Sequence, residues 1–213
     1  MIINENNFTL INKKISSKRL KEKKRILIGV VGPPCSGKST FSSQFNKFLI
    51  KKNKKEYSKI IPMDGFHFDN VILKKRNLLA RKGDPITFDV NGFIDLVKKI
   101  KFNINSSITF PLFDRDLELS RGSADIVQKN NRIIITEGNY LLLNYAPWNL
   151  LKKYIDIFVF LDVKKEILRE RSQKRWKYYG LSKKEILKKV KNDMNSVEIV
   201  LQNSNKANIV IEN

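Results

Sequence analysis

Residues 32–40 read Gly32-Pro33-Pro34-Cys35-Ser36-Gly37-Lys38-Ser39-Thr40, and the first eight match the pattern G-x-x-x-x-G-K-[ST] in full. An apolar run rich in β-branched residues, 26–31, precedes this stretch, and an amphipathic run, 39–51, follows it. A strand, a glycine-rich turn and a helix in this order predict a loop whose backbone N–H groups surround phosphate oxygens. A glycine-rich turn that matched by chance would lack such flanking elements. We therefore expect residues 32–40 to bind the phosphates of a nucleotide.

Three side chains in this loop have chemistry of their own. Lys38 is expected to reach the β- and γ-phosphates, and the Ser39 hydroxyl is expected to ligate Mg²⁺. Cys35 is either a redox handle or a small filler at a variable position, and we favour the filler. Switch GTPases, motor ATPases and small-molecule kinases all carry such a loop, so the rest of the site must decide the reaction.

Apolar runs alternate with helical patterns along the chain, which favours strands that are buried on both faces. We expect strands at 26–31, at a run ending near 62, and at 107–112, 132–136, 155–161 and 208–211. We expect helices at 39–51, 70–80, 89–101, 164–178 and 182–202. The fold class is α/β of the P-loop NTPase type, a parallel sheet with helices on both faces and a small helical lid at about residues 169–180. Residues 1–24 are expected to be an N-terminal extension, with one helix at most, before a P-loop kinase domain at 25–213.

Acidic residues follow several of the expected strands, and ligands bind at the carboxyl ends of strands in such sheets. Asp64 could accept a proton from an attacking hydroxyl, and a simple Asp-Gly turn is an equal alternative. Glu137 could hold Mg²⁺ or its water shell, or it could cap a strand end. Asp114 and Arg115 could contact the substrate or a phosphate.

The ordered set of motifs resembles the P-loop kinases that include uridine kinase, phosphoribulokinase and bacterial pantothenate kinase. It is most similar to the bacterial branch labelled nucleoside or fructose-transport-associated kinase. The resemblance spans about residues 25 to 180. It is carried by the loop 32–39, Met-Asp-Gly-Phe-His at 63–67, Arg-Lys-Gly-Asp-Pro-Ile-Thr-Phe-Asp at 81–89, residues 111–115, and Glu-Gly-Asn-Tyr-Leu-Leu at 137–142.

The resemblance implies roles residue by residue. Asp64 matches the acid that receives the substrate proton, and Glu137 matches the acid near Mg²⁺. His67, the one histidine of the chain, is expected to hydrogen-bond an acceptor hydroxyl rather than only to pack between phenylalanines. The expected substrate-binding residues are His67, Phe66, Asp114, Arg115 and Tyr140.

Arg171 and Arg175 lie four apart on an expected helix and so share a face. Arginines stabilise the charge on a phosphoryl group in transfer, and a mobile arginine helix can exclude water. A solvated basic face is the alternative, and the resemblance favours the lid. Asn192 and Asp193, on the following helix, are similar to an Asn-Asp pair of related sequences, which leaves a pocket role open, but we favour an ordinary polar face.

The formal net charge is +21, from 42 Lys and Arg against 21 Asp and Glu. The lysines are spread along the chain, so we favour a diffuse compositional bias over a nucleic-acid surface and expect no specific nucleic-acid partner. The single cysteine excludes an internal disulfide and fits a cytoplasmic protein. No apolar run approaches the roughly 20 residues of a membrane helix, so we expect no membrane association.

Together these features predict an ATP- and Mg²⁺-dependent kinase that phosphorylates a hydroxyl group of a small metabolite, such as a nucleoside, a sugar or a pantothenate-like acceptor. A nucleotide hydrolase or switch is the alternative, although the Asn-Lys-x-Asp pattern of a GTPase does not occur. A nucleic-acid-binding module is suggested by charge alone. A nucleoside monophosphate kinase is a further alternative, but the segment 64–69 suits a neutral hydroxyl compound better. Relatives that form dimers or tetramers make a homo-oligomer compatible with this interpretation.

Overall fold

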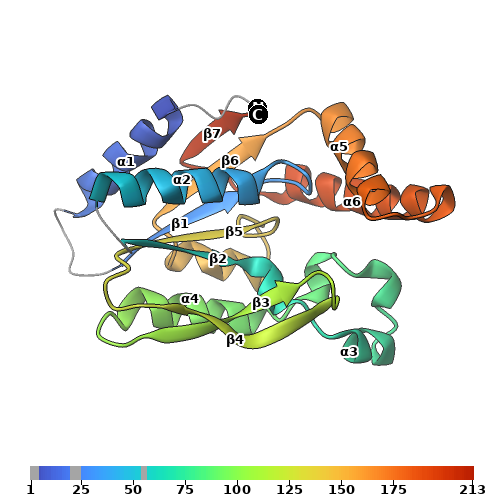
Figure 1. Ribbon diagram of the computed structural model, residues 1–213, viewed down its shortest axis with the longest axis horizontal. Coiled ribbons are helices and arrows are strands. Elements are labelled where there is room, and N and C mark those ends of the chain that lie inside the picture. The colour runs from blue at the N-terminus through green and yellow to red at the C-terminus, as the bar shows by residue number, and fades with distance from the viewer. Residues whose placement is uncertain (1–4, 20–24, 54–56) are drawn as a thin grey trace.

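A computed structural model describes residues 5–19, 25–53 and 57–213 of the chain (Figure 1). Five strands form a parallel sheet in the order β2-β5-β1-β6-β7. Their bounds are β1 Ile26–Val31, β2 Ser58–Pro62, β5 Ile133–Gly138, β6 Ile157–Asp162 and β7 Ile209–Glu212. All six residues of β1 are buried, as expected for a central parallel strand covered on both faces. The loop that follows β1 therefore leaves from the middle of the sheet.

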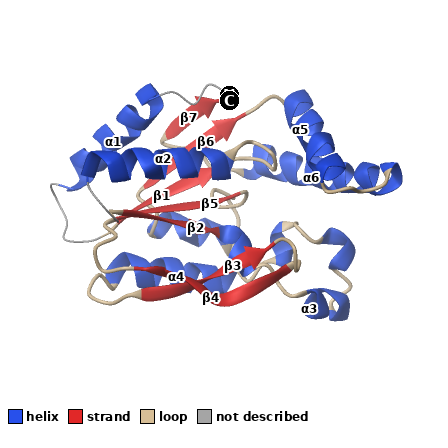
Figure 2. Cartoon of the chain, in the orientation of Figure 1, coloured by secondary structure: helices blue, strands red, loops and turns tan. Residues whose placement is uncertain are grey.

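Helices cover both faces of this sheet (Figures 1 and 2), which confirms the predicted α/β fold. On one face, Ile28 and Val30 of β1 pack with α1 Glu5–Arg19 and α2 Lys38–Asn53. On the other face, Leu27 and Val31 belong to a second core with α4 Val90–Phe102, the short helix η4 Trp148–Lys153 and part of α6 Lys183–Asn203. Alternate residues of one strand thus supply two cores.

The segment predicted as an N-terminal extension contributes helix α1 to the core. Its buried side chains Phe8, Ile11 and Ile15 follow the three- and four-residue spacing of one helix face. The ring of Phe8 lies 5.4 Å from the rings of both Phe41 and Phe45 on α2, measured between centroids. Helix α1 is therefore packed against the helix that begins at the phosphate loop.

A separate two-stranded antiparallel sheet consists of β3 Ile108–Asp114 and β4 Leu119–Val127. The strand predicted at 107–112 exists, but the prediction that it joins the parallel sheet is wrong, because it pairs with β4. Strand β4 itself was not predicted, since most of its side chains are polar and exposed or half-buried. This hairpin approaches the end of β2 closely: a Cβ on Gly65 would lie 2.3 Å from the carbonyl oxygen of Pro111.

The remaining elements lie around the carboxyl end of the sheet. They are η1 Met63–Phe66, α3 Asn70–Lys75, η2 Leu79–Arg81, η3 Pro85–Thr87 and α5 Lys165–Tyr178. Helix α3 ends earlier than predicted, and Asn77, at a φ of 55°, separates it from the next turn. Helices α5 and α6 stand side by side beyond the strand ends (Figure 1). They close one side of the region that the loop after β1 enters.

Candidate active site

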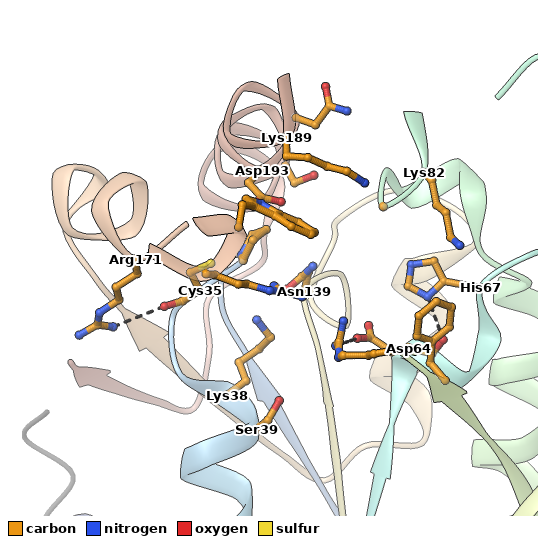
Figure 3. A pocket seen from close by; sticks show the side chains of 18 of the residues that line it. Cys35, Lys38, Ser39, Asp64, His67, Lys82, Asn139, Arg171, Lys189 and Asp193 are labelled. Atoms are coloured by element: carbon orange, nitrogen blue, oxygen red, sulfur yellow. Dashed lines mark hydrogen bonds and ion pairs between the residues drawn. The ribbon is translucent and has the colours of Figure 1, made fainter. Parts of the chain in front are cut away.

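A cleft of about 450 Å³ lies at the carboxyl ends of β1, β2 and β5. It is lined by the loop after β1, by η1, by the β3–β4 hairpin and by α5 and α6. Lys38, Ser39, Asp64 and Glu137 all line it, as ligand sites at strand ends in such sheets predict. Figure 3 shows Lys38 and Asp64 entering the same space from different elements. The sequence motifs that follow β1, β2 and β5 therefore meet in one place.

The phosphate loop is held by contacts within itself. The backbone N–H of Ser36 donates to the carbonyl of Pro33 at 3.2 Å, and Lys38 Nζ donates to the same carbonyl at 2.8 Å. Cys35 and Gly37 have φ values of 64° and 90°, so the chain turns back on itself here. A Cβ on Gly32 would lie 2.6 Å from Ser36 Oγ, which explains the glycine. Such a turn points backbone donors at an anion.

Burial lowers the pKa of Lys38, and the carboxylates of Glu137 and Asp64 partly offset this by raising it. The ammonium group is thus removed from water and surrounded by opposite charge. It needs little reorganisation to stabilise an anion at the loop, because the protein has already removed its hydration shell.

Ser39 and Glu137 form a pair of oxygen ligands suited to Mg²⁺. Ser39 Oγ donates to Glu137 Oε1 at 2.9 Å, at the start of α2 and the end of β5. Burial raises the pKa of Glu137 and nearby Asp64 adds to this, whereas Lys38 lowers it. The described residues contain no cluster of three or more His, Cys, Asp or Glu side chains placed to hold a metal. A pair of oxygen ligands fits Mg²⁺, which is bound through few protein groups together with phosphates and water.

Asp64 lies on η1, directly after β2, and its carboxylate faces the cleft. Its Oδ2 accepts from a guanidinium nitrogen of Arg115 at 2.8 Å. Its backbone carbonyl accepts from the N–H of His67 at 3.1 Å, which closes the turn. The turn therefore fixes the backbone of Asp64 and leaves the side chain at the surface of the cleft.

His67 is held as a neutral imidazole with a defined tautomer. Its ring packs on Phe88 at 4.0 Å and on Phe113 at 4.9 Å between centroids. Burial lowers its pKa, and the carboxylate and carbonyl of Asp64 only partly counter this. Nδ1 lies 2.8 Å from the Asp64 carbonyl oxygen, which can only accept, so Nδ1 carries the proton. Nε2 is then an acceptor, which suits a hydroxyl donor.

Three residues predicted to bind substrate do not line the cleft. Tyr140 is fully buried, and its hydroxyl donates to the carbonyl of Gly83 at 2.5 Å. The ring of Phe66 packs edge-on against Phe93. Asp114 accepts from two backbone N–H groups of its own turn and pairs with Arg121 at 3.2 Å. These three side chains shape the walls from behind, because each is already engaged in packing or local hydrogen bonds.

Both lid arginines reach the phosphate loop from α5. Arg171 donates to the Cys35 carbonyl at 3.4 Å, and Figure 3 shows its guanidinium directed away from Lys38. The guanidinium of Arg175 lies 5.0 Å from the ring of Trp176. Arg175 also interacts with the side chain of Cys35. Arg175 is therefore the better placed of the two to meet a phosphate.

The prediction that Asn192 and Asp193 form an ordinary polar face is wrong, since both line the cleft. Asp193 Oδ2 accepts from Ser172 Oγ at 2.6 Å and from Trp176 Nε1 at 2.8 Å, which ties α6 to α5. Asn192 Nδ2 donates to the carbonyl of Ala80 at 3.1 Å, which ties α6 to the opposite wall. The positions of Asn192 and Asp193 along the helix do not reveal these hydrogen-bond partners, which come from distant segments of the chain.

The sequence profile of the Phosphoribulokinase / Uridine kinase family matches residues 27–213. The chain belongs to this family. A Schizosaccharomyces pombe protein named "Putative uridine kinase" is 35% identical over 200 residues, which cover 91% of this chain and 85% of that protein. The Escherichia coli protein YggC is 30% identical over 191 residues, or 89% of this chain and 78% of its own. A crystal structure described as a "putative fructose transport system kinase" from Silicibacter sp. TM1040 superimposes with a TM-score of 0.84 at 33% identity, over 90% of this chain and 91% of that one.

Family membership confirms the predicted resemblance and the predicted class of reaction. Members are ATP-dependent kinases that phosphorylate a hydroxyl group of a small metabolite, and this chain is an enzyme of that class. Among the described helices, none has the length and apolar content needed to span a bilayer.

Proposed function

We propose that this family member positions ATP-Mg²⁺ on residues 32–40 and uses Asp64 to take the proton from the acceptor hydroxyl. The observation that carries the proposal is the meeting of Asp64, Lys38 and Glu137 in one cleft, each from a different strand end. A carboxylate that faces the phosphate loop is suited to accept a proton as the hydroxyl attacks. His67 Nε2 accepts from a neighbouring hydroxyl and so orients the acceptor.

The nucleotide and the metal have their own residues in the proposal. The backbone of the loop and Lys38 would hold the β- and γ-phosphates, while Ser39 and Glu137 would hold Mg²⁺. The metal supplies neutralisation of phosphate charge when it is bound. A cytoplasmic location, where ATP-Mg²⁺ is available, belongs to the same proposal.

The lid would complete the site when both ligands are present. Arg175 of α5 would stabilise the charge on the transferring group, and Arg171 would support it from the outer side of the loop. The contact of Asn192 with Ala80 links the lid helices to the acceptor wall. Closing the lid excludes water, so that ATP is used on the acceptor rather than hydrolysed.

Replacing Asp64 with Asn tests this assignment. We expect turnover to fall about 10²- to 10⁴-fold, the usual contribution of a general base, while the Kd for ATP changes little. Asp69→Asn is the matched control, because Asp69 caps α3 and lies outside the cleft. ADP release should be measured with ATP-Mg²⁺ alone and with nucleosides, sugars, pantothenate and glycerate. Near-normal turnover in Asp64→Asn would remove Asp64 as the base.

The same assay separates the kinase from a simple nucleotide hydrolase or switch. A kinase releases ADP much faster with one acceptor than without any. A steady rate that no compound alters would favour the hydrolase. Tight, salt-sensitive binding to DNA or RNA would instead support a nucleic-acid role for the +21 charge.

A further inference from the structure

The proposed base is already paired with a cation. Arg115 lies on the turn between β3 and β4, and its guanidinium donates to Asp64 Oδ2 at 2.8 Å. Both residues line the cleft. An acceptor hydroxyl must hydrogen-bond a carboxylate oxygen of Asp64 before it can transfer its proton. The ion pair occupies Oδ2, so Arg115 competes with the hydroxyl for one of the two carboxylate oxygens.

The pair is placed so that it can open. The side chains of Arg115 and Asp64 are 46% and 32% exposed, and ion pairs this open to solvent are weak. The turn below Arg115 is fixed, because the carboxylate of Asp114 accepts from the backbone N–H groups of Asp116 and Leu117, both at 3.1 Å. Arg115 can therefore exchange its partner by a side-chain movement while the hairpin stays in place.

The turn is also tied to the neighbouring wall. Lys82 Nζ donates to the carbonyl and the carboxylate of Glu118, both at 3.0 Å, and to Asn70 Oδ1 at 2.9 Å. A lysine has three N–H donors, so these contacts satisfy Lys82. Arg115 has five donors and uses one of them within the described part of the chain. Arg115 is thus the cation of this wall with capacity for a ligand.

A second cation lines the same cleft. Lys189 of α6 lines the cleft and lies 5.0 Å from the ring of Trp176. Figure 3 shows its side chain directed across the cleft toward the side from which Lys82 comes. Lys189 has no ion pair with any residue that the structure describes. Once Asp64 binds the acceptor hydroxyl instead of Arg115, neither Arg115 nor Lys189 has a carboxylate partner among the residues that the structure describes.

We propose that the acceptor is a hydroxyl compound that carries a carboxylate or phosphate group, that Arg115 and Lys189 bind this group, and that its binding releases Asp64 from Arg115. This inference rests on the proposed role of Asp64 as the base. It revises the expectation of a neutral acceptor that segment 64–69 alone suggested. Because Arg115 starts in contact with Asp64, the hydroxyl and the anionic group are expected to be only a few bonds apart.

The release of Asp64 couples the reaction to the acceptor. Once released, Asp64 takes the hydroxyl proton, the hydroxyl oxygen bonds to the γ-phosphorus of ATP, and the bond to the β-phosphate oxygen breaks, so that ADP leaves with the electron pair. Without the acceptor, Arg115 stays on Asp64 and keeps it from activating water. The ion pair thus acts as a guard against ATP hydrolysis.

The guard is tested with no acceptor present. We expect Arg115→Ala to hydrolyse ATP about 3- to 10-fold faster than the wild type, because a free carboxylate can then serve as base for water. Arg115→Lys should stay close to the wild type, and the double variant Asp64→Asn, Arg115→Ala should lose the gain. Arg121→Ala is the matched control, an arginine of the same hairpin that pairs with Asp114 outside the cleft. An Arg115→Ala rate at or below the wild-type rate overturns the guard.

The acceptor class is tested with matched compounds: glycerate against glycerol, pantothenate against pantothenol, and ribose 5-phosphate against ribose. At least one acid should exceed its neutral partner about tenfold or more in kcat/KM, and Arg115→Ala, unlike Arg121→Ala, should bring that ratio near one. The carboxylate and phosphate pairs distinguish the two anionic groups. If compounds turn over but no acid exceeds its neutral partner, the proposal is contradicted.

If no compound turns over, the same pairs are compared by calorimetric binding to Asp64→Asn protein with bound ATP-Mg²⁺. Tighter binding of an acid, lost in Arg115→Ala, supports the anionic acceptor. Equal binding of both members, or no binding of any acid, contradicts it. If Asp64 is not the base, the Asp64→Asn variant turns over at a near-normal rate. That result does not depend on the outcome for the Arg115 variants, so the two failures can be told apart.

Discussion

At the phosphate end of the cleft, the turn within residues 32–40 is closed by bonds among its own neighbours and backed by contacts from Arg171 and Asn213, whereas the acceptor end depends on exposed side-chain pairs between distant segments. Lys38 and the Pro33 carbonyl that it contacts are five residues apart. Asp64 and Arg115 are 51 residues apart, and Asn192 lies 112 residues from its partner. Local backbone contacts make the phosphate end rigid, while exposed side-chain pairs let the acceptor end adjust. Specificity therefore belongs to the acceptor end.

The largest effect is expected at the rigid end. Lys38→Met should lower turnover by about 10³-fold or more, because it removes the charge that stabilises the transferring phosphate. The protein should stay folded, since burial disfavours the charge of Lys38 more than the nearby carboxylates favour it, which lowers its pKa. Steady-state kinetics and thermal unfolding check both statements. Lys47→Met, at an exposed position of the same helix, is the control. Comparable loss in that control would point to the helix rather than to the charge.

Removing the metal-binding hydroxyl should have the next largest effect. Ser39→Ala should raise the Mg²⁺ concentration for half-maximal activity about 10- to 100-fold, as loss of a metal-supporting group does. Excess Mg²⁺ should restore part of the activity. Titration of activity with Mg²⁺ measures this, with Ser43→Ala on the exposed side of α2 as control. An unchanged Mg²⁺ requirement would place the metal elsewhere.

The lid offers a comparison within one helix. Arg175→Ala should lower kcat about 10- to 100-fold, whereas Arg171→Ala should cost at most a few-fold, because its guanidinium contacts the outside of the loop. Arg169→Ala, which is exposed and outside the cleft, should leave kcat unchanged. Equal losses in the Arg171 and Arg175 variants would mean that closure turns the Arg171 guanidinium toward the phosphates, as it does that of Arg175.

The smallest expected effect is at the link between α6 and the acceptor wall. Asn192→Ala removes one hydrogen bond to the Ala80 carbonyl, so the KM for the acceptor should rise about 2- to 10-fold. The KM for ATP and kcat should hardly change. Asn195→Ala, exposed on the same helix, is the control. A rise in the KM for ATP instead would show that α6 serves the phosphate end.

The phosphate end could be predicted from sequence because its determinants are contiguous. The glycines, Lys38 and Ser39 lie within one short pattern, and a buried strand and a helix flank it in the same order as in the structure. The positions of Asp64 and Glu137 followed from a general property of parallel sheets, whose strand ends meet at one edge. The central strands β1 and β5 were visible as apolar runs because nearly all of their residues are buried on both faces of the sheet.

The acceptor end could not be predicted to the same depth. Strand β4 is polar and exposed over most of its length, so it has no apolar pattern to reveal it. The pairing of Arg115 with Asp64 depends on where the β3–β4 hairpin docks, which no local pattern encodes. Tyr140 lies within the motif at 137–142, which favours a substrate contact from sequence, yet its buried hydroxyl donates to the Gly83 carbonyl.

Helix α1 has a practical consequence for anyone who shortens this protein. The family match begins at residue 27, so a cut based on that match would discard the helix. Phe8 of α1 packs against Phe41, Phe45 and Phe48 of α2, and its loss would leave those rings facing water. The shortened protein would then expose an apolar stripe along α2, the helix that starts at the phosphate loop. Poor solubility or weak ATP binding of that protein would be an artefact of the truncation.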